Sequence, residues 1–224
     1  MAPQIRQRSS VDVWRRIGTM GLIVAGILIL TAVLFPSPTD PADYSSFLAV
    51  LVEDMTRTRL VMITVPVGIW ALAAGIAAIY HSEEDGAASV GLRLGFYGVL
   101  AGATVVTVQF ALGSAALAES SRGAFDLGET LWAGATYVRS FGMLVLWAGL
   151  ASVGWGMLGN RRFAKWLGWP PIVLGVAMIA VSSATIVVGP TKGMTLASGG
   201  LAGLTAIWSV VLGVRSTHSQ LKST

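Results

Sequence analysis

The chain has 224 residues, of which 54% are hydrophobic and only 12% charged, and its mean hydropathy is +0.72. A soluble domain keeps about a quarter of its residues charged, so the composition excludes an ordinary soluble protein and indicates a membrane protein. The net charge of +4 reflects basic residues in short segments between apolar runs, which membrane topology explains without nucleic acid as a partner.

Six apolar stretches are long enough to cross the hydrocarbon core of a bilayer, which requires about 20 residues. In chain order they cover residues 17–35, 60–80, 90–118, 131–158, 170–189 and 194–214. The first is longer than the core of a signal peptide and lacks a small-residue cleavage site, so we expect it to stay as a helix. The pattern predicts an all-α fold, a polytopic membrane bundle of about six transmembrane helices that forms a single domain over residues 1–224.

The segment between the first two spans predicts a short helix of its own. Asp40 followed by Pro41 is a good helix start, because a carboxylate caps free amide groups and proline has no amide hydrogen to satisfy. Apolar side chains then recur at helical spacing, at Tyr44, Phe47, Leu48, Leu51 and Met55. An amphipathic helix on the outer membrane surface fits this pattern, and so does a cap packed on the bundle.

The distribution of basic residues predicts which end of the bundle faces the cytoplasm. With the N-terminus inside, the cations of the inner segments are Arg6, Arg8, Arg15, Arg16, Arg93, Arg161, Arg162, Lys165, Arg215 and Lys222, and those of the outer segments are Arg57, Arg59, Arg122 and Lys192. Cytoplasmic loops carry the excess of cations. We therefore expect a multi-pass protein of a bacterial-type plasma membrane with both termini in the cytoplasm.

Small residues predict how the third and fourth spans meet. One stripe on the third span consists of Gly91, Gly95, Gly98, Gly102, Gln109 and Gly113, and one on the fourth of Arg139, Gly142, Gly149 and Gly156. Because lipid competes equally for apolar side chains, small residues that let backbones approach are a main means of joining membrane helices. We expect both stripes to face protein, in an antiparallel hairpin.

The spans hold few groups that could carry chemistry. They contain no Asp, Glu, Lys or His, and their one charged side chain, apart from Arg93 at a cytoplasmic edge, is Arg139. Proton-coupled carriers usually need intramembrane acids or histidines, and the serines have no base nearby to activate them. With no cysteine in the chain either, we predict a protein that is not an enzyme and holds no metal or other cofactor.

Arg139 is nevertheless a candidate binding residue. It lies about 12 Å along the helix from the start of the fourth span, where an arginine costs a few kcal/mol, and in a hairpin that turns at Gly123 the Gln109 side chain reaches a similar depth. A polar pocket open to the outer surface would be completed by residues close in sequence: Tyr137, Thr107, Glu119 and Glu129.

Two interpretations of Arg139 are open. In the first, Arg139 holds an anionic or strongly polar head group that Gln109 helps to orient. In the second, the long side chain only reaches the outer interface or Glu129, with no ligand involved.

The loop before the fifth span is basic and aromatic. Arg161, Arg162, Lys165, Trp166 and Trp169 are typical of an interfacial anchor at the lipid head groups, and a specific anionic-lipid site that uses the two arginines is the alternative. The loop, from Arg161 to Trp169, resembles one in uncharacterised bacterial six-helix integral membrane proteins that are grouped as a domain of unknown function. The resemblance implies a six-helix bundle without an assigned activity.

Three functions follow from these observations. The first is a non-catalytic membrane protein, either a complex subunit or a lipid-interacting scaffold, whose partners are membrane lipids and other membrane protein subunits. The second is a carrier or channel for a small solute that is recognised at Gln109 and Arg139; interrupted helices are expected there, and Pro66 is the one hint of them. The third is an enzyme acting on lipid, for which the sequence offers no adequate acid, base or metal set.

The predicted topology places Arg161 and His218 on the same side of the membrane. Labelling or protease digestion of intact cells should leave both positions protected, because both lie in cytoplasmic segments. Modification of one position but not the other would contradict the topology.

Overall fold

The computed structural model describes the backbone of residues 2–33, 43–81, 87–161 and 163–221, and the side chains within 16–33, 43–81, 90–161 and 163–216. This part of the chain is helical and contains no strand; its helices are α1 (Ala2–Val33), α2 (Tyr44–Glu53), α3 (Met55–His81), α4 (Ala87–Ser121), α5 (Phe125–Gly159), α6 (Lys165–Val188) and α7 (Lys192–Leu221). Six of them are long and apolar enough to cross a membrane. The predicted all-α membrane bundle is therefore confirmed.

The six long helices correspond to the six predicted spans. Their membrane segments cover Arg16–Val33, Met55–His81, Val90–Ser121, Phe125–Gly159, Lys165–Val188 and Lys192–Ser216. Most are longer than the apolar runs, because a helix continues into the polar residues beside the membrane once its backbone hydrogen bonds are established. Residues 34–35 of the first predicted span lie outside the described residues.

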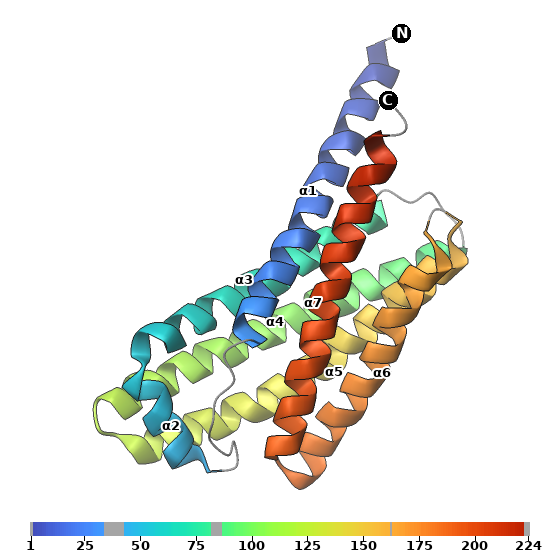
Figure 1. Ribbon diagram of the computed structural model, residues 1–224. Coiled ribbons are helices and arrows are strands. Elements are labelled where there is room, and N and C mark those ends of the chain that lie inside the picture. Colours follow the sequence, from blue (N-terminus) through green and yellow to red (C-terminus); the bar gives the residue numbers. More distant parts are fainter. Residues whose placement is uncertain (1, 34–42, 82–86, 162, 222–224) are drawn as a thin grey trace.

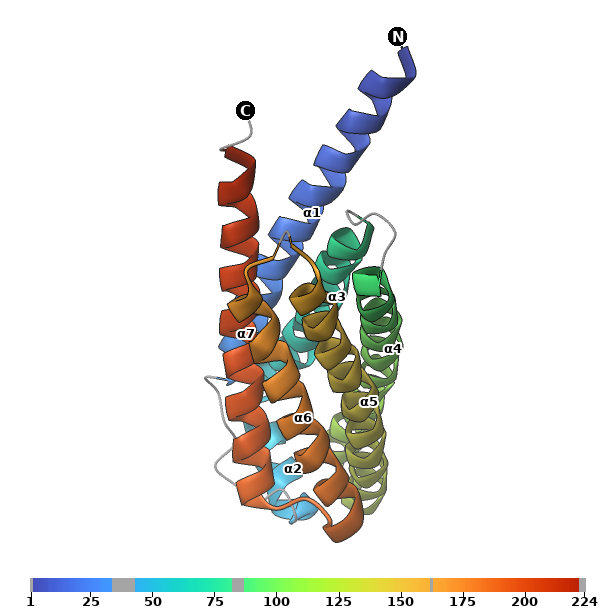
Figure 2. The same ribbon diagram turned by 90° about the vertical axis from the view of Figure 1, so that its right-hand side faces the viewer.

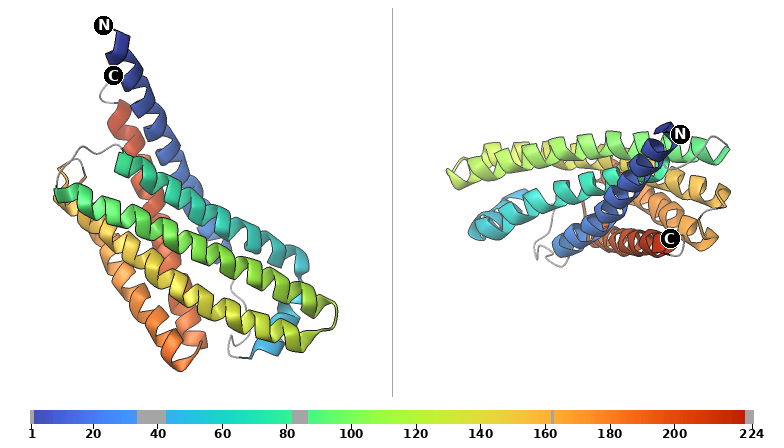
Figure 3. Two further views of the ribbon diagram at one scale, coloured as in Figure 1. Left: turned by 180° about the vertical axis from the view of Figure 1, so that it is seen from behind. Right: turned by 90° about the horizontal axis from the view of Figure 1, so that it is seen from above.

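The six long helices form a closed ring. Each packs against two neighbours, in the order α1, α3, α4, α5, α6, α7 and back to α1. Both termini lie at one end of the molecule, beyond which α1 and α7 project, and α2 lies at the other end (Figures 1 and 2). Seen from above, α4 and α7 lie on opposite sides of the bundle (Figure 3).

The most extensive contact in the ring joins α4 to α5. A Cβ atom placed on Gly98 would lie 2.7 Å from the Cα atom of Gly149, and one placed on Gly91 would lie 2.9 Å from the Cα atom of Gly156. Such distances leave no room for side chains, so the two backbones are in direct contact. The prediction that the two glycine stripes face protein and each other is confirmed.

The buried apolar side chains form two separate clusters. The main cluster draws on all six long helices, and its most deeply buried large members include Leu22, Ile76, Leu92, Leu150, Met157 and Leu212. The outer cluster lies at the α2 end and consists of Leu48, Ala116 and Leu117, with Met62 and Trp132 among the side chains packed against it.

Helix α2 caps the end of the bundle opposite the termini. Its N-cap is Asp43, whose carboxylate accepts a hydrogen bond from the Ser46 amide at 3.2 Å. The predicted helix start at Asp40 and Pro41 lies outside the described residues. Leu48 is fully buried against α4, and the Phe47 ring lies 5.3 Å from the ring of Trp132 on α5. Of the two interpretations of this segment, the structure therefore favours the cap packed on the bundle.

The α4–α5 contact predicts a strong difference between two glycines of the same helix. Gly149→Ala should lower the stability of the protein by about 1–3 kcal/mol, because the added Cβ would lie 2.5 Å from the backbone nitrogen of Val99. Gly134→Ala is the matched control, since no described atom lies within 4 Å of its Cβ position and alanine favours the helix by about 1 kcal/mol. Thermal unfolding in detergent measures both, and equal effects would contradict the direct backbone contact.

The N-cap of α2 predicts that this helix is sensitive to acid. Hydrogen bonds from Ser46 hold the pKa of Asp43 below its ordinary value of 3.8, so the cap stabilises α2 above that pH and is lost as the pH falls through the lower folded value. Amide hydrogen exchange of α2 should therefore rise below pH 3.8 in the wild type relative to Asp43→Asn. Asparagine is also a good N-cap and does not titrate. Equal exchange in the two proteins at every pH would show that the carboxylate does not stabilise α2.

Candidate functional site

The contacts between α4 and α5 place Gln109 and Arg139 at the same level of the bundle. On one side of this level, the Cβ position of Gly142 lies beside Val105 and Val106. On the other side, the Cβ position of Gly113 lies 3.2 Å from the Trp132 ring. Gln109 lies between these contacts on α4 and Arg139 lies between them on α5, so the predicted equal depth is confirmed.

The Arg139 side chain is exposed, yet it lies on the core-facing side of α5. A helix turns by about 100° per residue, so positions 139, 146, 150 and 157 fall within about 40° of one another. Leu150 and Met157 have no exposed surface, and Leu146 is 3% exposed. Arg139 is exposed on the same face. Arg139 is therefore an accessible residue on a helix face that is otherwise buried.

The level of Arg139 lies between the two apolar clusters. The main cluster and the side chains packed on it extend along α5 as far as Met143, and the outer cluster begins at Trp132. Of the described residues, those at 133–142 of α5 belong to neither cluster. The polar level of Arg139 thus interrupts the apolar interior.

Neither polar side chain of this level has a partner among the described residues. Gln109 is only 8% exposed, and its side-chain amide makes no hydrogen bond to a described residue. Every fully buried side-chain oxygen or nitrogen among the described residues does have a hydrogen-bond partner. The Gln109 amide therefore borders accessible space. Arg139 likewise forms no hydrogen bond or ion pair with a described residue, so an ion pair with Glu129 is not formed.

The structure adds two residues that the sequence did not indicate. Tyr44, at the start of α2, lies beside Thr136 and Tyr137 of α5, and burial raises the pKa of its phenol, with Tyr137 adding to the increase. Thr136 lies on α5 one turn from Arg139. The sequence placed Tyr44 on the apolar face of its helix, and only the packing of α2 on α5 shows that it lies beside a polar residue near Arg139.

The other predicted site residues lie elsewhere. Tyr137 is two residues from Arg139, hence about 200° around the helix on the opposite face. Glu119 is about 15 Å along α4 from Gln109, in an ion pair of 2.8 Å with Arg122. Glu129 is about 15 Å along α5 from Arg139.

Thr107 contacts α3. Its hydroxyl accepts a hydrogen bond of 3.0 Å from Trp70 Nε1 and donates one to the backbone oxygen of Ala103. Thr107 therefore joins α4 to α3 and is not part of the site at Arg139. Arg139 and Gln109 are the members of the predicted pocket that the structure brings to one level.

The predicted interfacial anchor lies at the end of the bundle that carries the termini. Arg161, Lys165, Trp166 and Trp169 are all exposed there, and Arg162 lies outside the described residues.

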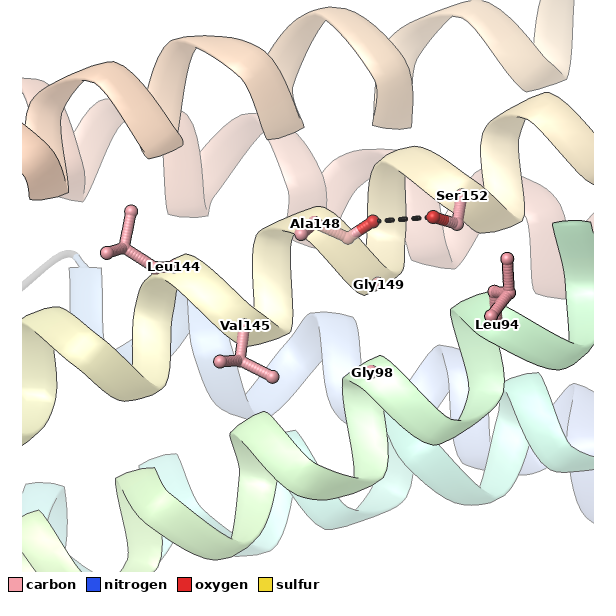
Figure 4. A pocket seen from close by; sticks show the side chains of 7 residues that line it. All are labelled: Leu94, Gly98, Leu144, Val145, Ala148, Gly149 and Ser152. Atoms are coloured by element: carbon pink, nitrogen blue, oxygen red, sulfur yellow. Dashed lines mark hydrogen bonds between the residues drawn. The ribbon is translucent and has the colours of Figure 1, made fainter.

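A shallow groove lies on the outer surface of the ring, over the α4–α5 contact (Figure 4). This groove has a volume of about 420 Å³ and is lined by Leu94, Gly98, Leu144, Val145, Ala148, Gly149 and Ser152. The Ser152 hydroxyl donates its hydrogen bond to the backbone oxygen of Ala148. The groove is therefore apolar and has no side chain that would fix a polar ligand.

Comparison with known proteins adds no relative: no family model, no curated protein and no solved structure matches the chain. The resemblance of the loop at 161–169 to the six-helix family stays a prediction, and function has to be argued from the site alone.

Proposed function

We propose that the protein is a non-catalytic membrane protein that binds an anionic amphiphile, whose head group is held by Arg139. The observation that carries this proposal is the position of Arg139, an exposed arginine on the core-facing side of α5 at a level between two apolar clusters. An arginine near the middle of a transmembrane helix costs about 2.5–3.5 kcal/mol on insertion scales. A bound anion offsets that cost.

The surroundings of Arg139 support an amphiphile rather than a small hydrophilic ion. Apolar clusters lie on both sides of the polar level, so a ligand there places only a small part of its surface against polar groups. The unpartnered amide of Gln109 can donate a second hydrogen bond to the same head group. A membrane lipid combines these properties and is present at high concentration around the protein.

The carrier alternative has less support. That hypothesis expects interrupted helices near the middle of the membrane, and Pro66 was the one hint of an interruption. Helix α3 runs without a break from Met55 to His81 with Pro66 inside it. We therefore favour binding over transport.

We also infer that both termini lie in the cytoplasm of a bacterial-type cell. The excess of Lys and Arg in the segments on that side of the sequence supports this orientation. In this orientation the Arg139 level is closer to the outer surface, since α2 lies at the end opposite the termini (Figure 1).

Substitution of Arg139 tests the proposed function. Charge-assisted hydrogen bonds contribute about 1.5–3 kcal/mol, so Arg139→Gln should reduce the retention of anionic amphiphiles at least about tenfold. Arg139→Lys should retain most of it. Native mass spectrometry after extraction in a mild detergent measures the retained molecules directly and also identifies their head groups.

Arg59→Gln serves as the matched control, since Arg59 is an exposed arginine in a different helix near the same end of the bundle. It should leave retention unchanged. A thermal unfolding measurement adds a second readout: after delipidation Arg139→Gln should unfold at a higher temperature than the wild type, because an uncompensated charge has been removed. Unchanged retention in a folded Arg139→Gln protein would refute the proposal.

A further inference from the structure

We propose that the corner where α6 begins and α7 ends is a binding site for an anionic phospholipid of the leaflet at the terminus-bearing end. Lys165 and Arg215 supply the cationic part of this site, and the exposed face of α6 supplies an apolar part below it. The site is separate from Arg139, which lies in the half of α5 that is farther from the start of α6. It does not depend on the function proposed above.

Arg215 is held in place by an aromatic ring. Its Cζ atom lies 5.3 Å from the centroid of the Trp166 ring, within the distance at which a guanidinium is attracted to an aromatic face. The two helices are also joined next to this contact, because Trp208 Nε1 donates a hydrogen bond of 2.9 Å to the backbone oxygen of Leu167. The guanidinium is thus positioned beside the start of α6 before any ligand binds.

A second cation lies at the same corner. Lys165 is the first residue of α6 and is exposed, directly before the ring on which Arg215 stacks. Arg161, also exposed, precedes it in the connection from α5. Two cations on neighbouring helices can bind one phosphodiester, which a single surface lysine does not hold specifically.

An apolar surface continues from this cationic corner into the membrane. Trp166, Trp169, Val173 and Val176 fall within about 80° of one another on α6. Trp166 is 49% exposed, and each of the other three is more than half exposed. The head group of one lipid can therefore contact the cations at the start of α6 while its acyl chain lies along the apolar face that follows.

The described carboxylates lie away from this corner. The acidic residues with described side chains are Asp43, Glu53, Asp54, Glu119, Asp126 and Glu129. All of them belong to α2, its end, or the α4–α5 turn region, at the end opposite the termini (Figure 1). Hence no described carboxylate competes for Lys165 and Arg215.

Lipid titration of the full-length purified protein tests this site. Phosphatidylglycerol and phosphatidylcholine are titrated into detergent-solubilised protein, and bound lipid is counted by native mass spectrometry. A basic residue near an anionic membrane surface contributes a factor of about five in affinity, so Lys165→Gln and Arg215→Gln should each lower the preference for phosphatidylglycerol about fivefold. Trp166→Leu should lower it too, without any change of charge.

Lys192→Gln is the matched control, because Lys192 is the exposed first residue of α7 at the opposite end. It should leave the preference unchanged. Inorganic phosphate should displace no more phosphatidylglycerol than chloride at the same ionic strength, since the apolar face contributes to lipid binding. Equal losses in Lys165→Gln and Lys192→Gln, no loss in Trp166→Leu, or full displacement by phosphate would each overturn the proposal.

Discussion

The direct backbone contact between α4 and α5 is the constraint on which the rest of the structure depends. In hydrocarbon, apolar side chains gain nothing by leaving lipid for protein, so helix association relies on close packing. Gly98 and Gly149 allow that packing by leaving no side chain between the backbones. The contact fixes the register of the two helices, and the register in turn places Gln109 opposite Arg139.

Two kinds of charge placement coexist in this bundle. At the terminus-bearing end, Lys165 and Arg215 lie where water and head groups solvate them, and the neighbouring tryptophan only orients one of them. Arg139, in contrast, lies within a membrane-spanning helix at a level between two apolar clusters. The first arrangement is inexpensive and common at membrane surfaces, whereas the second is costly and therefore calls for a functional explanation.

The sequence was sufficient for the architecture because lipid restricts the possible structures so strongly. Every backbone polar group must be satisfied within the membrane, so long apolar runs specify helices, and the small residues from Gly91 to Gly156 identify the closest pair. The site was only half predictable. Spacing along two helices predicted that Arg139 and Gln109 lie at the same level. Tyr137 and Thr107 lie near that level too, but each is on a different face of its helix and so is not part of the site. The packing of Tyr44 against Thr136 is a long-range contact that no local pattern encodes.

The ring is closed by the contact between its first and last helices. Gly26 of α1 packs against Ala206 and Val210 of α7, and Gly213 of α7 packs against Ile23 of α1. During synthesis α1 can dock on α3 early, but its second protein-facing side has no partner until α7 has entered the membrane. The last contact to form therefore involves the first helix, and an insertion intermediate that lacks α7 exposes the Gly26 face of α1 to the bilayer.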